Sequence, residues 1–114
     1  MKSSRAIAAL PTLLQRALRK LGQDLSATRR RRRLTMALAA ERAMISRATL
    51  MRVERGDPHV SMGIYATVLF IYGLGERIGD LADIGSDEIG RALELEQLPK
   101  RVRARSKTRG RGPA

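Results

Sequence analysis

The residues best equipped for chemistry lie in one basic stretch of the chain, Ser46 to Gly56, which reads SRATLMRVERG. Its aliphatic residues Leu50 and Val53 are spaced to share one face of a helix. The opposite face then carries guanidinium, hydroxyl and small side chains, which suit phosphate oxygens and base edges in a DNA groove. The stretch predicts a short helix that packs on a core through one face and meets a nucleic acid with the other.

The limits of this helix follow from its end residues. Ser46 is suited to accept a hydrogen bond from the first turn, and Gly56 is typical of the position after a helix. Between them, the outward residues predicted to read bases are Arg47, Ala48, Thr49, Met51 and Arg52. The two arginines are expected to form bidentate hydrogen bonds with guanine, with phosphate contact as the alternative for each.

A run of consecutive arginines, Arg29 to Arg33, closes an earlier helix that we expect to begin at Pro11 or Thr12. Positive charge is favourable there, because the helix dipole is negative at its C-terminal end. The run fits a nuclear-localisation-like patch, a solvated helix end or a set of phosphate contacts. We favour phosphate contact, and the residues assigned this role are Arg30, Arg31, Arg32, Arg33, Thr35, Ser46 and Arg55.

Charge is strongly segregated along the chain, whose net charge is +12 over 114 residues. Residues 1–56 contain 14 Lys or Arg against 3 Asp or Glu, residues 57–98 contain 2 against 8, and residues 99–114 contain 7 against none. This pattern favours a polyanion-binding front, an acidic middle that faces elsewhere and a basic tail. A merely solvated basic surface is the alternative.

Composition excludes several kinds of site. The chain has no cysteine, no tryptophan and a single histidine, His59, which we place in a turn as a loop residue or a contact near phosphate. We therefore predict no catalytic residue, no metal and no cofactor. Only 3% of the residues are aromatic, so base stacking on single strands is poorly supported. The glycines at 73, 75 and 79 have the wrong spacing for a dinucleotide fingerprint and follow no predicted strand.

Hydrophobic spacing predicts an all-α fold. The apolar stripe of the first helix is Leu14, Leu18, Leu21, Leu25 and Thr28. Gly22 weakens this helix and allows its first turns to form a separate segment. Thr35 is expected to cap a helix over 36–42, joined to the basic helix by a connector of about three residues, 43–45.

The acidic middle is predicted to continue the helical pattern. Ser61 should cap a buried core helix within the longest apolar run, Val60 to Leu74, whose main core residues are Ile64, Tyr65, Val68, Leu69, Ile71 and Tyr72. This run has about 15 residues, short of a membrane span, and no signal peptide is recognisable, so we expect a cytoplasmic protein without a membrane partner. Further helices are predicted over 76–82 and from a Ser86 cap to about Gln97.

The stretch from Thr35 to Gly56 resembles the helix-turn-helix of the XRE (lambda-repressor-like) family. The residues in register with that family are Thr35, Ala40, Ile45, Ser46, Leu50, Val53, Glu54 and Gly56. The resemblance covers about residues 21–83 and implies a five-helix lambda-repressor-like domain, here with an extra C-terminal helix and a basic disordered tail. It also implies sequence-specific binding of double-stranded DNA by a homodimer on a palindromic operator.

Two residues depart from the family pattern. Met36 stands where the family often has a Gln that contacts phosphate, and Met44 stands where Gly is usual in the turn. A non-glycine residue is strained in a left-handed conformation, so this turn either differs in geometry or tolerates that strain. The family also commonly pairs an arginine of its first helix with the glutamate at the position of Glu54, which implies a structural ion pair with Arg29.

Two further segments, GDPHVSMGIYATVL at 56–69 and LPKRVR at 98–103, resemble HipB-type antitoxins. Such proteins are encoded beside HipA-like serine/threonine kinase toxins, which implies an autorepressor with a kinase partner. The alternatives are a stand-alone or phage-type repressor and a nonspecific architectural or RNA-binding protein. The predicted layout is a lead-in (1–11), a helix-turn-helix domain (12–83), an acidic helix for the dimer or partner (84–98) and a flexible basic tail (99–114).

Overall fold

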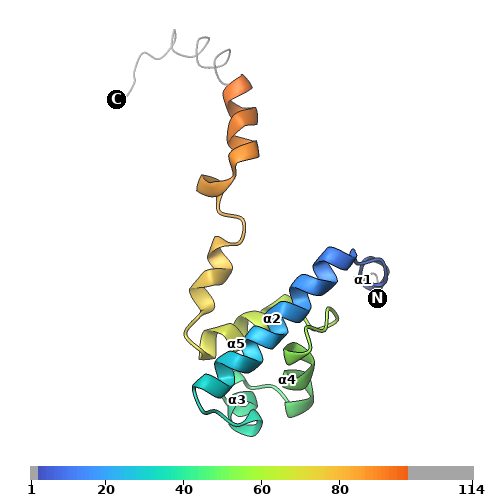
Figure 1. Cartoon of the computed structure of the whole chain (residues 1–114), viewed down its shortest axis with the longest axis vertical. Helices are drawn as coiled ribbons and strands as arrows, with labels where there is room; N and C mark the ends of the chain where they lie inside the picture. The colour runs from blue at the N-terminus through green and yellow to red at the C-terminus, as the bar shows by residue number, and fades with distance from the viewer. Residues whose placement is uncertain (1–2, 98–114) are drawn as a thin grey trace. The chain divides into compact units, whose positions relative to one another are not determined.

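The computed structural model describes residues 3–97, and every regular element in that range is helical (Figure 1). The elements are α1 (Ser3–Ala8), α2 (Thr12–Arg31), α3 (Met36–Ala43), α4 (Arg47–Glu54), α5 (Met62–Ile71) and the 3-10 turns η1 (Gly75–Asp80) and η2 (Ile84–Ser86). Residues 88–97 are helical as well. The predicted all-α class and the extra C-terminal helix are thus confirmed, whereas the tail at 99–114 lies outside the described residues.

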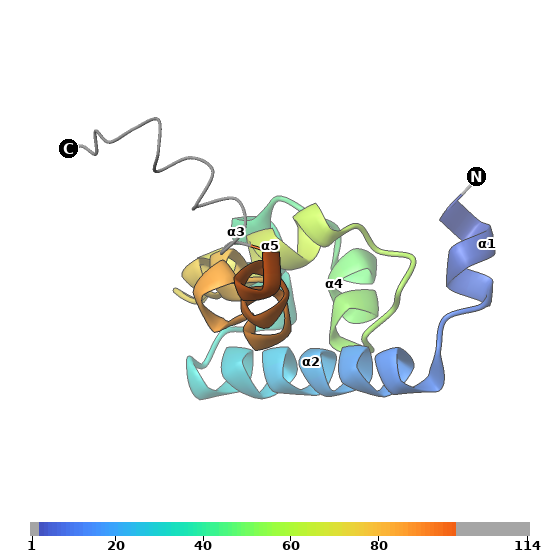
Figure 2. The same ribbon diagram turned by 90° about the horizontal axis from the view of Figure 1, so that it is seen from above.

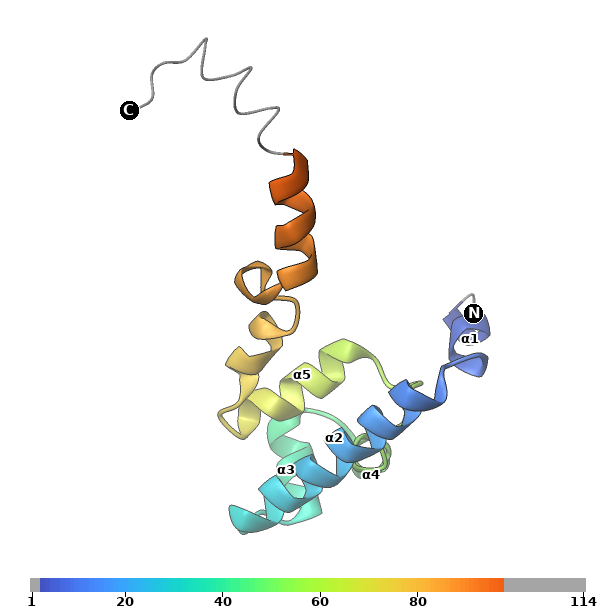
Figure 3. The same ribbon diagram turned by 45° about the horizontal axis from the view of Figure 1, so that its top comes forward.

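The chain forms two compact units, one up to Ile78 and the other from Gly79 onward. In the first unit, α2 packs on α4, and α3 packs on both α4 and α5. Figure 2 shows α2 running along one side of the other core helices, and Figure 3 shows α3 and α4 beside it. The largest fully buried side chains are Leu25, Leu50, Val53 and Val68. The small buried residues of α3, Ala39, Ala40 and Ala43, let its neighbours approach closely.

Three helices begin at the side-chain caps that the sequence predicts. Thr35 accepts a hydrogen bond from the backbone N–H of Leu38 at 3.1 Å, and Ser61 accepts one from Ile64 at 3.2 Å. Ser46 does the same for Thr49 at 3.0 Å. Each cap satisfies a first-turn donor that has no partner within its own helix, so the starts of α3, α4 and α5 are fixed locally.

Two expectations near the N-terminus need correction. Residues 3–8 form α1 instead of an irregular lead-in, because an alanine-rich segment favours helix and Pro11 ends it by imposing a break before α2. In addition, α2 is continuous from Thr12 to Arg31, and Gly22 does not divide it. Gly22 is buried instead, and it faces the backbone of residues 54–56.

Three further expectations after α4 also need correction. The segment predicted as a helix over 76–82 forms the 3-10 turn η1, where glycines at 75 and 79 disfavour a regular α-helix. The cap of the last helix is Asp87, whose carboxylate accepts from Gly90 N–H at 3.0 Å, whereas Ser86 donates to Asp83. Phe70 lies within the run predicted to be buried, yet its side chain is 72% exposed. Most residues of α5 are apolar, so their pattern does not distinguish the outward face from the buried one.

Candidate nucleic-acid interface

The connection between α3 and α4 is a tight turn through Met44 and Ile45. Met44 has φ 58° and ψ 42°, a left-handed conformation, and its N–H donates to the carbonyl of Glu41 at 3.0 Å. The following N–H, that of Ile45, donates to Ala40 O at 3.0 Å. The turn therefore keeps the geometry usually taken by glycine and tolerates a strain of about 1–2 kcal/mol at Met44. The side chain of Met44 is 90% exposed, so it makes little packing contact in return.

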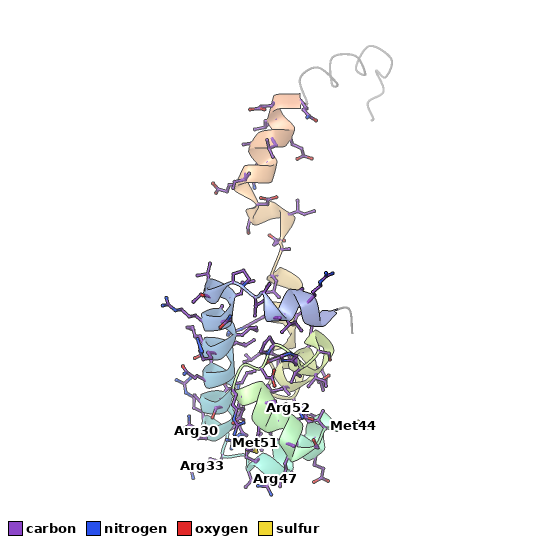
Figure 4. The ribbon with its side chains drawn as sticks, turned by 90° about the vertical axis from the view of Figure 1, so that its right-hand side faces the viewer. Arg30, Arg33, Met44, Arg47, Met51 and Arg52 are labelled. Atoms are coloured by element: carbon purple, nitrogen blue, oxygen red, sulfur yellow. The ribbon has the colours of Figure 1, made fainter. Side chains whose placement is uncertain are left out.

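The two faces of α4 separate as predicted from the spacing of its residues. Leu50 and Val53 have no exposed surface, and they belong to the core. Figure 4 shows the side chains of Arg47, Met51 and Arg52 projecting outward from α4, and all three are exposed. Ala48 is also exposed and Thr49 is half-buried. The exposed face combines two guanidinium groups with a methyl and a thioether, which suits a mixed polar and apolar groove edge.

The hydroxyl groups at the start of α4 are linked to each other. Ser46 Oγ accepts from the backbone of Thr49 and donates to Thr49 Oγ1 at 3.0 Å. The hydroxyl proton of Thr49 is therefore free to be donated to a phosphate or a base. By contrast, a phosphate contact through the hydroxyl of Ser46 would replace its hydrogen bond to Thr49, because phosphate oxygens only accept.

The arginine run diverges at the end of α2. Arg31 is the last residue of the helix, and Arg33 has φ 54°, a left-handed conformation that turns the chain toward α3. Arg30 and Arg32 donate to carbonyls of the preceding turn, each at 3.3 Å, and Arg32 also lies 6.0 Å from the ring centroid of Tyr72. The side chains of residues 30–33 are all exposed, and Figure 4 shows Arg30 and Arg33 at the same end of the domain as Arg47.

Arg29 points inward, unlike the other members of the run. Its Nε lies 2.7 Å from Glu54 Oε2, and a second nitrogen lies 3.2 Å from Oε1, so the ion pair is bidentate. The remaining guanidinium nitrogen donates to Leu34 O at 2.9 Å. The hydrogen bond to Glu54 is the main cause that raises the pKa of Arg29. The ion pair joins the C-terminal ends of α2 and α4. Its two side chains are only 12% and 11% exposed, so the pair lies beneath the surface.

A cleft at the C-terminal end of α4 brings together residues that the sequence does not associate. It has a volume of about 400 Å³, and its charged lining includes Arg19, Arg52 and Arg55. Ile7 and Leu10 at the α1 end line it as well, so the segment expected to be a lead-in contributes a wall. Nothing in the local pattern distinguishes Arg19 from Arg16 one turn earlier, and this explains why sequence reasoning missed it.

The loop after α4 is held by two internal contacts. The carboxylate of Asp57 accepts from the backbone N–H of His59 at 2.8 Å and lies 3.1 Å from His59 Nδ1, and the backbone bond lowers the pKa of Asp57. The hydroxyl of Tyr65 donates to Asp57 O at 2.8 Å, and burial raises the pKa of Tyr65 to about 12, so this donor stays protonated. His59 is an exposed loop residue, as expected.

The residues that the structure describes contain no group of three or more His, Cys, Asp or Glu side chains placed to hold a metal ion. Between residues 3 and 97, no helix combines the length and the apolar character that crossing a membrane would require.

Comparison with known protein families identifies a helix-turn-helix domain. A family model described as a helix-turn-helix domain matches residues 20–81, more than half of the chain and the whole of α3, α4 and α5. No match was found among curated proteins, and none among solved structures.

Proposed function

Because the chain belongs to the helix-turn-helix domain family and is a DNA-binding regulator, we propose that it is a sequence-specific repressor of transcription. The observation that carries this proposal is the two-sided character of α4. One side is fixed in the core by Leu50 and Val53, and the other exposes Arg47 and Arg52. In the proposed mode, α4 lies in the major groove and its N-terminal turns contact the base edges.

The exposed residues then divide by chemistry. We propose that Arg47 and Arg52 form bidentate hydrogen bonds with guanine, while Ala48 and Met51 contact apolar base edges and Thr49 donates to a base or a phosphate. The residues proposed to contact phosphates are Arg30, Arg31, Arg32, Arg33, Thr35, Ser46 and Arg55. Arg31 and Arg33 are the best placed of the run, since no hydrogen bond within the described residues occupies their guanidinium groups. The phosphate contacts fix the register of α4 and the base contacts supply specificity.

Selection of bound duplexes from a random pool tests this assignment. The wild-type protein should enrich a palindromic consensus, and Arg47→Ala or Arg52→Ala should each relax one position of it, at a cost of about 1–3 kcal/mol in discrimination. Arg42→Ala is the matched control, because Arg42 is exposed in the last turn of α3 and has no proposed contact. If both α4 variants keep the parental consensus, the base-reading assignment is wrong. If the wild type enriches nothing at physiological salt, nonspecific binding is the better description.

We further propose that the second unit supplies a homodimer contact and a surface for a HipA-like kinase toxin, within an operon that the protein itself represses. The second unit exposes an apolar set at 58–83% of each side chain: Leu81, Ile84, Ile89, Leu93 and Leu95. Its carboxylates would be repelled by DNA, so this surface is expected to face a protein. A second copy also supplies the second half-site of a palindrome. This role implies a cytoplasmic protein that is associated with the nucleoid when it is bound to DNA.

Light scattering after size exclusion tests the partners. Alone, the protein should have twice the 12.6 kDa mass of one chain. Co-expressed with the product of the adjacent gene, it should elute in a larger complex that contains both proteins. Leu93→Glu places a charge in the exposed apolar set and should reduce one or both associations, while Gln97→Glu, which adds the same charge to the same helix outside that set, serves as the control. A dimer that retains no such partner would favour a stand-alone or phage-type repressor.

A further inference from the structure

Three arginines line the cleft at the C-terminal end of α4, which we call the arginine cleft. Arg19 comes from the middle of α2, Arg52 from the last turn of α4, and Arg55 follows that helix. Its apolar wall includes Ile7, Leu10 and Pro58. Figures 1 to 3 agree in placing α1 near the loop that joins α4 to α5.

The backbone fixes Arg19 next to the end of α4. A Cβ atom added to Gly56 would lie 2.2 Å from Leu18 O and 2.7 Å from the Cα of Arg19, so only glycine allows this contact. Gly56 also has φ +73°, which carries the chain from α4 past α2. Arg19 and Arg55 therefore start from neighbouring backbone positions, and the cleft is a consequence of the packing of α2 on α4.

The arginine cleft has an excess of positive charge among the described residues, with three arginines against the single carboxylate of Asp57. No hydrogen bond or ion pair occupies the guanidinium groups of Arg19, Arg52 or Arg55 in that part of the chain. The carboxylate of Asp57 also lines the cleft, where it accepts a hydrogen bond from the backbone N–H of His59 and offsets one of the three positive charges. Like charges gathered in a concave, partly apolar space repel each other more strongly than on an open surface. An anion bound between them would reverse this interaction and gain charge-assisted hydrogen bonds.

We propose that the arginine cleft binds a phosphate group, and that this group belongs to the DNA backbone beside the groove that α4 enters. The inference rests on the proposed placement of α4 in the major groove, because Arg52 and Arg55 then lie at the end of the inserted helix. Arg19 and Arg55 become the phosphate ligands, because Arg52 is proposed to read a base, and α1 supplies an apolar wall that limits access of water to the contact. A free phosphate offers the same chemistry, so the test separates the two sources.

Arg19→Ala is the informative variant, because Arg19 has no proposed role in base reading and its side chain is exposed. Its affinity for a selected duplex and for a scrambled duplex should fall by about the same factor, roughly tenfold, and the slope of log K against log salt should decrease by about 1. Arg16→Ala is the control, since it removes the same charge from α2 outside the cleft. Ile7→Glu, which places a carboxylate in the wall, should reproduce the loss caused by Arg19→Ala.

The second part of the test measures thermal unfolding in inorganic phosphate without DNA. If phosphate raises the Tm of the wild type but not of Arg19→Ala, while DNA binding is equal for the two, the cleft is an anion site but the backbone source is wrong. If Arg19→Ala matches Arg16→Ala in both parts of the test, the whole proposal is overturned. A wild type that binds selected and scrambled duplexes equally would contradict sequence-specific repression, and the salt slope on the scrambled duplex would still decide the role of Arg19.

Discussion

Arg29→Ala should lower the free energy of unfolding by about 3–5 kcal/mol, whereas Arg31→Ala should change it by less than about 0.5 kcal/mol. The two residues belong to the same run of arginines, but their surroundings differ. Arg29 pairs bidentately with Glu54, whose side chain is 11% exposed, and it also donates to Leu34 O. Removing Arg29 leaves a largely buried carboxylate and a carbonyl without their partner. Arg31 is exposed, and within the described residues its guanidinium group takes part in no hydrogen bond or ion pair.

Urea unfolding followed by circular dichroism would measure this difference. A domain of this size has a total stability of about 5–15 kcal/mol, so Arg29→Ala should be strongly destabilised or unfolded at 37 °C. The double variant Arg29→Met with Glu54→Leu separates the two causes of the loss. Because both charges are then removed together, it should recover much of the stability lost by Arg29→Ala. Equal unfolding midpoints for Arg29→Ala and Arg31→Ala would show that the pair does not stabilise the fold.

The sequence predicts those parts of the fold that depend on local chemistry. A capping hydroxyl followed by apolar residues marks the starts of α3, α4 and α5, and the spacing of Leu50 and Val53 identifies the buried face of α4. The pairing of Arg29 with Glu54 is different, because the two residues are 25 positions apart. No helical period connects them, and the expectation of this pair came from the family resemblance.

The remaining features depend on how segments meet, which local patterns do not contain. Asp83, Ser86 and Asp87 all belong to residue types that commonly cap helices. Ser86 lies in the turn η2 and donates its hydroxyl to Asp83, so Asp87 is the residue that caps the last helix. The arginine cleft is a second case. It needs Ile7 from before Pro11, Arg19 from mid-helix and Arg55 from after α4. These residues have no common period, and their proximity follows from the close contact at Gly56.

Gly22→Ala should destabilise the protein by about 3 kcal/mol, although alanine is intrinsically better than glycine inside a helix by about 1 kcal/mol. A Cβ atom at position 22 would lie 2.6 Å from both Glu54 O and Gly56 N. These are backbone atoms at the end of α4, so relief of the clash requires the whole end of that helix to move. The movement would also disturb the ion pair between Arg29 and Glu54. Arg29 lies on α2 and Glu54 lies on α4, and these two helices would move apart.

Gly63→Ala is the matched control, and it should have the opposite sign. Gly63 is also a helical glycine, but a Cβ atom there would meet only Ser61 Oγ, at 3.8 Å. The substitution should therefore stabilise the protein by about 0.5–1 kcal/mol, through the helix propensity of alanine and the reduced entropy of the unfolded chain. Urea midpoints of the two variants on opposite sides of the wild type would establish that α2 and α4 are in backbone contact at Gly22. Equal midpoints would mean that α4 lies farther from α2 than the structure has it. The close approach of α2 to Gly56 would then not form the arginine cleft.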